Sequence, residues 1–558
     1  MKKIIILITC LISALSTNAQ PESAQKASDA IFTLTTFNKD GSIHASSHGV
    51  FISNDGEAIS TWKPFYGAAY AVVVNSKGEE MKVESLIGAN ELYDVCRFKI
   101  KGKTPTAPIA VKPAETGDKV WILKYSTKKA KGEQINIDKT EKFGDKYTYY
   151  IFNKANADIN ESCPIVNGNG EIIGLLQKSS TLNQGCATDA NFIRYGLNET
   201  NGLSINDPLL SQSGIRIALP KDYNQATLML MLASQQNDSV KYINYANDFI
   251  EKFPTATDGY IAKARIAANH DDFTKADEIM SLAINNASNK DIAHSEYAGL
   301  IYRKLIYNLD STTIDKKRWT LSKALEEAQQ AYEINPLPQY QHQKAQILFS
   351  QNDYQKAYDI LNSLSKKDLH TNEIFYEAAQ CKMQMKAPFE EIKNLLDSAV
   401  SACPKPLDRT AAPYILARGI AMDKVGKYRD ALLDYIAYDT LMAGHAAPTF
   451  YYTRSQCETK LRRYEQAIND MAHAAVLNPQ EPTYLAELAS LQLRVGQFRD
   501  AIQTADICIS RAPQYTDAYI IKGISQIQSK QKEDGLKTLT KAKELGDERA
   551  EQYINKYK

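Results

Sequence analysis

The sequence predicts a chain of two architectures: an all-β part at residues 24–220, and an all-α part that fills most of the remainder. Three observations support this division. Short alternating or β-branched runs between turn dipeptides characterise the first part, which is typical of antiparallel sandwiches and barrels. After Pro220, apolar residues at helical spacing replace these runs. A pattern with a period of about 34 residues then recurs as far as residue 546, which indicates stacked helical hairpins.

The composition argues against two classes of partner. Lys and Arg total 66 against 65 for Asp and Glu, so the chain of 558 residues has no charge excess to steer it to nucleic acid or an anionic membrane. The 32 tyrosines outnumber the 16 phenylalanines, which suits large amphipathic faces without singling out a ligand. The sequence predicts no nucleic-acid partner, and it leaves the oligomeric state open.

The N-terminus has the layout of a cleaved export signal. Two lysines precede an apolar run at residues 4–15, and small residues follow at 16–19. We therefore expect residues 1–19 to be removed and the mature chain to be exported to the periplasm, the cell envelope or the extracellular space. The apolar run is short for a membrane span, and no later stretch is long and apolar enough for one.

Eight cysteines are present, and seven remain once residues 1–19 are removed. An odd number in an oxidising compartment leaves at least one thiol unpaired. Cys163 and Cys186 flank one predicted hairpin and are the candidate disulfide. The cysteines show no metal-type spacing and the eight histidines are scattered, so the sequence predicts no metal site and no cofactor.

The all-β part contains several runs that predict strands, each next to a turn signal. Such short strands with regular turns indicate a sandwich or a barrel. About 200 residues suffice for two small six-stranded barrels. The clearest runs are residues 50–53, 70–75, 120–123, 147–152 and 171–177.

This part resembles the trypsin-like serine proteases, particularly the periplasmic heat-shock proteases of bacteria. Residues 49–61 follow the family's strand and turn that lead to the catalytic histidine, and residues 92–100 follow the strand that carries the catalytic aspartate. Residues 116–121 are similar to the opening of the second barrel, 160–174 pass through the nucleophile loop, and 214–220 resemble the last strand. The resemblance implies a double β-barrel.

The departures from that family fall on the residues that carry its chemistry. Lys63 stands at the position of the histidine, and a lysine cannot relay the serine proton as an imidazole does. Counted without a gap, Glu161 stands at the nucleophile position, and Ser162 and Cys163 replace two glycines that shape the oxyanion-binding backbone. Only Asp94 matches the family, and we expect it to pair with Lys63. These departures predict a non-catalytic barrel.

A different alignment with the family predicts a barrel that has protease activity. One deleted residue would place Ser162 at the nucleophile position, where a neutral Lys63 would serve as the base. His44 or His48 from the neighbouring strand would be another source of a base. The protein would then be an active exported serine endopeptidase whose helical part directs its choice of substrate.

The helical part begins with a divergent hairpin at residues 221–256, and residues 257–546 resemble the tetratricopeptide repeat. Small residues fall where paired helices cross, an aromatic follows the turn, and a proline closes the second helix. We expect a long loop at residues 309–313 and a polar capping helix at 547–558. In the two best copies Tyr451, Ser455, Tyr464, Ala467, Ala474 and Pro479 recur as Leu485, Ala489, Phe498, Ala501, Cys508 and Pro513.

The repeat resemblance implies a superhelix whose first helices line a groove that binds peptides or proteins. The array lacks the Lys/Asn/Arg pattern with which some family members clamp a C-terminal carboxylate. We therefore predict an exported interaction scaffold, with glycan handling as a weaker alternative because no aromatic sugar platform can be assigned. The groove candidates on the two best copies are Tyr452, Gln456, Glu487, Ser490 and Arg494.

Overall fold

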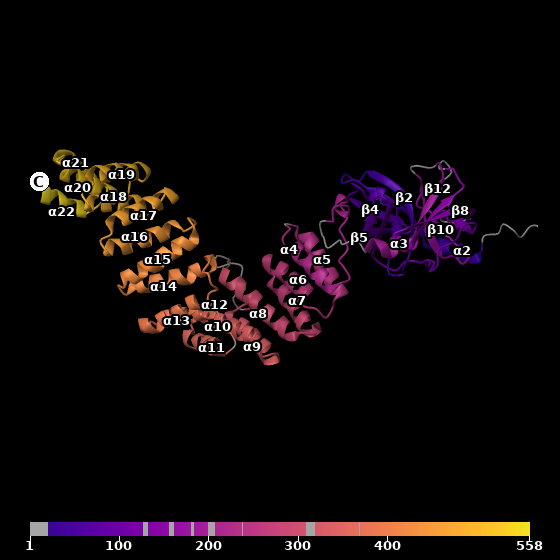
Figure 1. Cartoon of the computed structure of the whole chain (residues 1–558), viewed down its shortest axis with the longest axis horizontal. Helices are drawn as coiled ribbons and strands as arrows, with labels where there is room; N and C mark the ends of the chain where they lie inside the picture. The colour runs from indigo at the N-terminus through magenta and orange to yellow at the C-terminus, as the bar shows by residue number, and fades with distance from the viewer. Residues whose placement is uncertain are drawn as a thin grey trace, which may run out of the picture. The chain divides into compact units, whose positions relative to one another are not determined.

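Two compact units make up the chain, Met1–Asn289 and Lys290–Lys558. The predicted export signal at residues 1–19 and the predicted loop at 309–313 lie outside the described residues. Within the described part, no helix has both the length and the apolar character that crossing a membrane requires. The computed structural model describes residues 21–126, 132–155, 161–179, 183–198, 207–236, 238–307, 318–367 and 369–558 (Figure 1).

Six antiparallel strands close the first barrel in the order β1-β2-β3-β6-β5-β4. Burial alternates along β4, where Ala71 and Val73 are buried between partly exposed neighbours. Gly56 permits the turn before β3, because its φ is +95° and a Cβ there would lie 2.1 Å from the carbonyl oxygen of Ile100. The strands are β1 (Ile31–Phe37), β2 (Ile43–Phe51), β3 (Glu57–Ser60), β4 (Tyr70–Val74), β5 (Glu80–Asn90) and β6 (Val95–Ile100).

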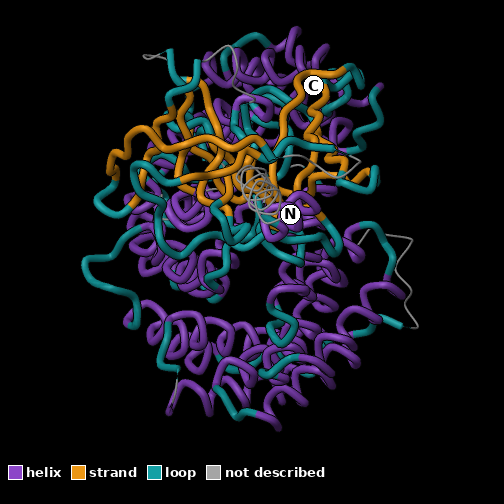
Figure 2. Tube along the Cα trace, turned by 90° about the vertical axis from the view of Figure 1, so that its right-hand side faces the viewer, coloured by secondary structure: helices purple, strands orange, loops and turns teal. Residues whose placement is uncertain are grey.

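A second closed barrel follows in the order β10-β11-β12-β9-β8-β7, and its strands are among those coloured orange in Figure 2. All six strands supply its core, for example Val120 from β7, Tyr150 from β9 and Leu176 from β11. The predicted double barrel is confirmed. The strands are β7 (Lys119–Ile122), β8 (Glu133–Phe143), β9 (Tyr147–Phe152), β10 (Pro164–Val166), β11 (Ile172–Lys178) and β12 (Gly185–Asp189).

Residues 214–220 do not form the last strand that their resemblance implied. Both barrels close without them, and Ile217 instead makes an isolated parallel bridge to Leu86 of β5. The Leu86 N–H donates to Arg216 O at 2.9 Å, and the Ala218 N–H donates to Leu86 O at 2.7 Å. This segment therefore extends the wall of the first barrel and leads into the helices.

In the described part of the first unit, four α-helices follow the barrels. Arg216 links α5 to the first barrel, because its guanidinium pairs with Asp248 of α5 and lies 3.1 Å from Glu84 of β5. The Asp222 and Asp238 carboxylates cap α4 and α5 by accepting backbone N–H groups. The helices are α4 (Tyr223–Ser234), α5 (Ser239–Lys252), α6 (Asp258–Asn269) and α7 (Phe273–Asn286), and two short helices, α2 (Glu22–Ala27) and α3 (Ala190–Tyr195), accompany the barrels.

The second unit is an array of paired helices, as predicted. Its assignment to the tetratricopeptide family stays a prediction. The helices are α8 (Lys290–Tyr307), α9 (Leu321–Ile334), α10 (Pro338–Ser350), α11 (Tyr354–Lys367), α12 (Asn372–Gln384), α13 (Phe389–Ser401), α14 (Ala412–Lys424), α15 (Tyr428–Met442), α16 (Pro448–Lys460), α17 (Tyr464–Leu477), α18 (Pro482–Arg494), α19 (Phe498–Arg511), α20 (Thr516–Gln528), α21 (Lys532–Glu544) and α22 (Arg549–Tyr557).

The recurring residues have local reasons for their positions. The aromatic of each pattern begins the second helix of a pair, as Tyr464 begins α17 and Phe498 begins α19. Ala467 and Ala501 are fully buried one turn later, where a larger side chain would separate the two helices. The turn before each aromatic contains a left-handed residue, Arg462 in one pair and Gly496 in the next.

Candidate functional site

Asp94 holds the backbone of Trp62 and Lys63 in place. It lies at the end of the turn before β6, and its Oδ1 accepts the N–H groups of Trp62 at 3.1 Å and Lys63 at 2.8 Å. Its Oδ2 lies 3.4 Å from the Lys63 ammonium, so the expected ion pair is present. The Lys63 side chain is 78% exposed, so water screens this pair and its net contribution is small.

Ser162 belongs to a cluster of three hydroxyl groups, which we call the hydroxyl cluster. Its Oγ lies 2.5 Å from Ser47 Oγ and 3.0 Å from Thr61 Oγ1, and these two oxygens lie 3.0 Å apart. Ser162 is 2% exposed. Because each hydroxyl can both donate and accept, the three groups satisfy one another without a titrating residue.

The backbone of Ser162 is fixed by an internal hydrogen bond and has a left-handed conformation. In serine proteases the nucleophile's own N–H helps to bind the oxyanion. The Ser162 N–H instead donates to Leu176 O of β11 at 2.7 Å. Its φ of +67° lies in the left-handed region, where a glycine fits without strain. Ser162 thus occupies a glycine-type backbone position, and its side chain is buried.

Neither nearby histidine reaches the Ser162 hydroxyl. The two ring nitrogens of His44 face Asn38 Oδ1 at 3.0 Å and Tyr66 O at 2.8 Å. His48 follows Ser47 in β2, and successive strand residues point to opposite faces, so its ring faces away from the hydroxyl cluster. Burial lowers the pKa of His48. Among the described residues, therefore, no nitrogen base is hydrogen-bonded to Ser162.

Glu161 and the two candidate cysteines differ in their surroundings. Glu161 is exposed. The predicted disulfide is wrong, since both thiols are free. Cys163 packs in the core of the second barrel. Ala187 of β12 also points into this core, and successive strand residues point to opposite faces, so the side chain of Cys186 points out of the barrel. The wall of the barrel separates the two sulfurs.

A glutamine from the second barrel braces the Asp94 turn. Gln177 Nε2 donates to the carbonyl oxygens of Tyr93 and Asp94, the latter at 3.1 Å, and Gln177 Oε1 accepts from Thr188 Oγ1 at 2.9 Å. Sequence reasoning missed Gln177 and Thr188, together with Ser47 and Thr61. They lie at ordinary strand and loop positions, so no local pattern marks them.

The predicted groove residues lie on two first helices of the array. Tyr452 and Gln456 are on α16, and Glu487, Ser490 and Arg494 are on α18. Burial raises the pKa of Tyr452, and so does the negative charge of Glu487 nearby. Burial also raises the pKa of Glu487, and its neighbour Asp517 adds to the shift. The face thus combines aromatic and acidic groups.

The array also contains a set of buried ion pairs that sequence reasoning missed. Arg454 donates from two nitrogens to Asp470, at 2.6 and 2.7 Å, and from a third to Asp439 at 2.8 Å. Arg418 pairs in the same manner with Asp434 and Asp397. Each arginine lies on a first helix and joins the second helices of its own and the preceding pair. The spacing from Arg418 to Asp434 equals that from Arg454 to Asp470, so the sequence did contain a pattern that could have predicted these ion pairs.

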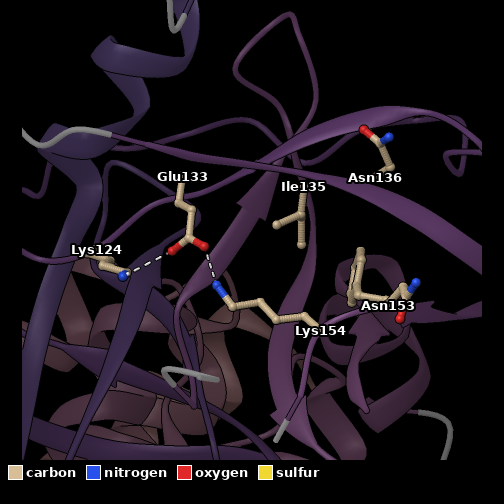
Figure 3. A pocket seen from close by; sticks show the side chains of 7 residues that line it. Lys124, Glu133, Ile135, Asn136, Asn153 and Lys154 are labelled. Atoms are coloured by element: carbon tan, nitrogen blue, oxygen red, sulfur yellow. Dashed lines mark hydrogen bonds and ion pairs between the residues drawn. The ribbon is translucent and has the colours of Figure 1, made fainter. Parts of the chain in front are cut away.

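Two hollows in the first unit lie outside this arrangement. One of about 710 Å³ is lined by Lys124, Glu133 and Lys154, and Glu133 pairs with both lysines (Figure 3). The hydrogen bond from Lys154 holds the pKa of Glu133 below its usual range. The other, of about 730 Å³, borders β5 and α5 and contains the Arg216–Asp248 pair. In both hollows the named charged side chains are thus paired within the chain.

No protein-family model and no curated protein matches this sequence. Among solved structures, the chain is similar to the serine endoprotease from Yersinia pestis at 21% identity and a TM-score of 0.27, over 32% of this chain and 68% of that chain. It is also similar to the inactive form of the Rv3671c protease at 15% identity and a TM-score of 0.25, over 31% of this chain and 90% of that chain. Neither match bears on whether this chain cleaves peptides.

Proposed function

We propose that this protein is an exported scaffold that binds protein or peptide partners at the cell envelope and does not cleave them. One observation carries the proposal: the position of the catalytic base holds Lys63, whose ammonium pairs with Asp94 and not with a hydroxyl. Peptide cleavage by this fold needs a base that takes the nucleophile's proton and returns it to the leaving amine. A lysine whose nitrogen contacts a carboxylate and no hydroxyl is not placed to take that proton.

The hydroxyl cluster supports the same proposal. The Ser162 hydroxyl contacts two other hydroxyls, and its N–H is bonded to Leu176 O, so neither group is available to a substrate without breaking internal hydrogen bonds. Breaking them costs about 1 kcal/mol each. The alternative, an active serine endopeptidase, rests on the retained geometry of Asp94 and on the presence of a serine in the loop.

Labelling by a fluorophosphonate probe distinguishes the two functions. We expect no labelling of the chain, because the probe reacts with serines that a base has activated. Ser162→Ala and Lys63→Ala should give the same blank result, with an active trypsin-like protease as the positive control. A labelled band that disappears in Ser162→Ala would overturn the proposal in favour of the endopeptidase.

We assign the binding role to the face of α16 and α18 around Tyr452 and Glu487. The Tyr452 and Tyr484 rings lie 5.8 Å apart, and both Tyr452 and Glu487 are partly exposed. Aromatic side chains next to a carboxylate suit a peptide that brings apolar and basic groups. This assignment concerns the array alone.

Affinity capture from envelope extracts tests the assignment. The bait is the chain from residue 20 onward, compared with a Tyr452→Ala, Glu487→Gln double variant. Val476→Ala is the matched control, because Val476 is 76% exposed on the second helix α17. We expect the double variant to lose proteins that the wild type and Val476→Ala both retain. Equal recovery by all three baits would show that another surface binds the partners.

A further inference from the structure

Three metal-binding side chains meet on the first helices of two successive pairs in the array. His342 lies on α10, and Glu373 and Glu377 lie on α12. One ligand atom from each lies within 4.8 Å of the other two. His342 Nε2 and Glu377 Oε2 are 2.6 Å apart. Among the residues that the structure describes, this is the one group of three such side chains with this geometry.

Helix periodicity and stacking bring these residues together. Glu373 and Glu377 are four residues apart, so they share one face of α12. His342 and Glu377 are about one repeat apart, so they occupy similar positions on consecutive first helices. The scattered histidines of the sequence gave no hint of this, because the ligands come from different pairs.

The chemistry of the three ligands selects a class of ion. Imidazole and carboxylate together suit Zn²⁺ and neighbouring divalent transition metals, whereas Ca²⁺ and Mg²⁺ prefer oxygen ligands alone. Three protein ligands with water as the fourth make a common zinc arrangement. We infer that His342, Glu373 and Glu377 bind a divalent transition-metal ion of the zinc type.

A neighbouring amide completes the surroundings of the site. Gln346, one turn after His342, donates to Glu377 Oε1 at 2.8 Å and leaves Oε2 facing the imidazole. Such a contact orients a carboxylate ligand. A bound ion would join α10 to α12 and so link two successive pairs of helices, a structural role independent of the proposed barrel and groove functions.

The array contains a natural control. His294 Nδ1 of α8 lies 2.7 Å from Glu327 Oε2 of α9, and both side chains are as buried as those of the His342–Glu377 pair. No third ligand among the described residues completes this second pair. The two pairs therefore separate metal binding from an ordinary histidine–glutamate hydrogen bond.

Calorimetric titration of ZnCl₂ into the metal-stripped chain from residue 20 onward tests the inference. We expect one tight site per chain and a higher thermal midpoint with Zn²⁺. His342→Ala and Glu377→Gln should each weaken Zn²⁺ binding by at least about tenfold. Loss of a residue that only supports a metal ligand typically weakens binding by about 10–100-fold, and loss of a direct ligand should cost no less. His294→Ala should bind as the wild type does.

Two further measurements check that the variants are folded and that the cysteines are not the metal ligands. Circular dichroism without metal verifies that each variant is folded. Co²⁺ in place of Zn²⁺ should give visible d–d bands without thiolate charge-transfer absorption, which excludes the cysteines as the ligands. Equal Zn²⁺ affinity in the wild type and His342→Ala, or a thiolate band with Co²⁺, would overturn the inference.

Discussion

The polar side chains of the candidate site in the barrels differ in their surroundings from those on the first-helix face of the array. In the barrels, the Ser162 hydroxyl and the Asp94 carboxylate have hydrogen-bond partners within the chain. On the array, Tyr452 and Glu487 remain partly exposed. Groups already paired must break bonds to meet a ligand, whereas exposed groups need not. This difference is the reason for proposing the array as the binding region and the barrels as a folded frame.

The largest expected effect concerns the ion pairs of the array. Arg454→Ala removes the shared cation of Asp470 and Asp439, whose pairing is largely buried. We expect the free energy of unfolding of the array to fall by about 3–5 kcal/mol, because a buried charge then lacks its partner. Chemical denaturation followed by circular dichroism measures this change.

Lys541→Ala is the control for that experiment. Lys541 and Glu544 form an exposed pair at 3.0 Å, and such pairs contribute at most about 1 kcal/mol. Similar losses in both variants would mean that the buried pairs do not hold the array together.

The next effect depends on pH. Burial raises the pKa of Glu458 on α16 to about 7, and the nearby charge of Asp470 adds to the shift. Because the pKa in the folded state exceeds the unfolded value of 4.5, the neutral carboxyl stabilises the fold at low pH, and this contribution is lost as pH rises from 4.5 through 7. Between pH 4.5 and 8 we expect a loss of about 1–3 kcal/mol.

Glu458→Gln tests this dependence, since the amide stays neutral throughout. Its stability should vary less between pH 4.5 and 8 than that of the wild type, as followed by thermal unfolding at each pH. Parallel pH profiles for the two proteins would show that Glu458 does not titrate in this range.

A smaller effect is expected in the barrels. Ser162→Ala removes the hydroxyl from the hydroxyl cluster while Ser47 and Thr61 still bond to each other, so we expect a loss of about 1 kcal/mol. Ser162→Gly loses the same bonds but relaxes the left-handed backbone, so it should be the more stable of the two variants. Thermal unfolding ranks them, and the reverse order would contradict the glycine-type position assigned to Ser162.

The smallest effect is a gain. Arg462 has a φ of +59° in the turn between α16 and α17, where the neighbouring pairs have Gly426 and Gly496. Arg462→Gly should stabilise the array by about 0.5–1 kcal/mol, because glycine adopts this conformation without steric cost. The measurement is the midpoint of chemical denaturation, with Arg463→Gly as a control that should destabilise. A loss of stability in Arg462→Gly would contradict this account of the turn.

Much of the fold was predictable because it follows from local patterns. Alternation and turn signals marked the barrels, and recurring alanines and aromatics marked the starts and crossings of the paired helices. Lys63 and Asp94 also meet as expected, since two strands of one barrel fix their separation. The export signal and the repeat family remain predictions.

Contacts between distant segments were not predictable. The hydroxyl cluster joins Ser162 of one barrel to Ser47 and Thr61 of the other, and the ligand group around His342 joins two pairs of helices. The expected Cys163–Cys186 disulfide was wrong for a related reason. The positions of the two cysteines around a hairpin do not reveal on which side of the barrel wall each sulfur lies. Such details depend on how closed sheets and stacked helices pack.

The central claim is that the barrels do not cleave peptide bonds. Its most direct test is to incubate the chain from residue 20 onward with an unstructured protein substrate and to follow cleavage by mass spectrometry, beside Ser162→Ala and Lys63→Ala. The account predicts an intact substrate in all three reactions at equal enzyme concentration. Defined fragments from the wild type that vanish with Ser162→Ala would contradict it.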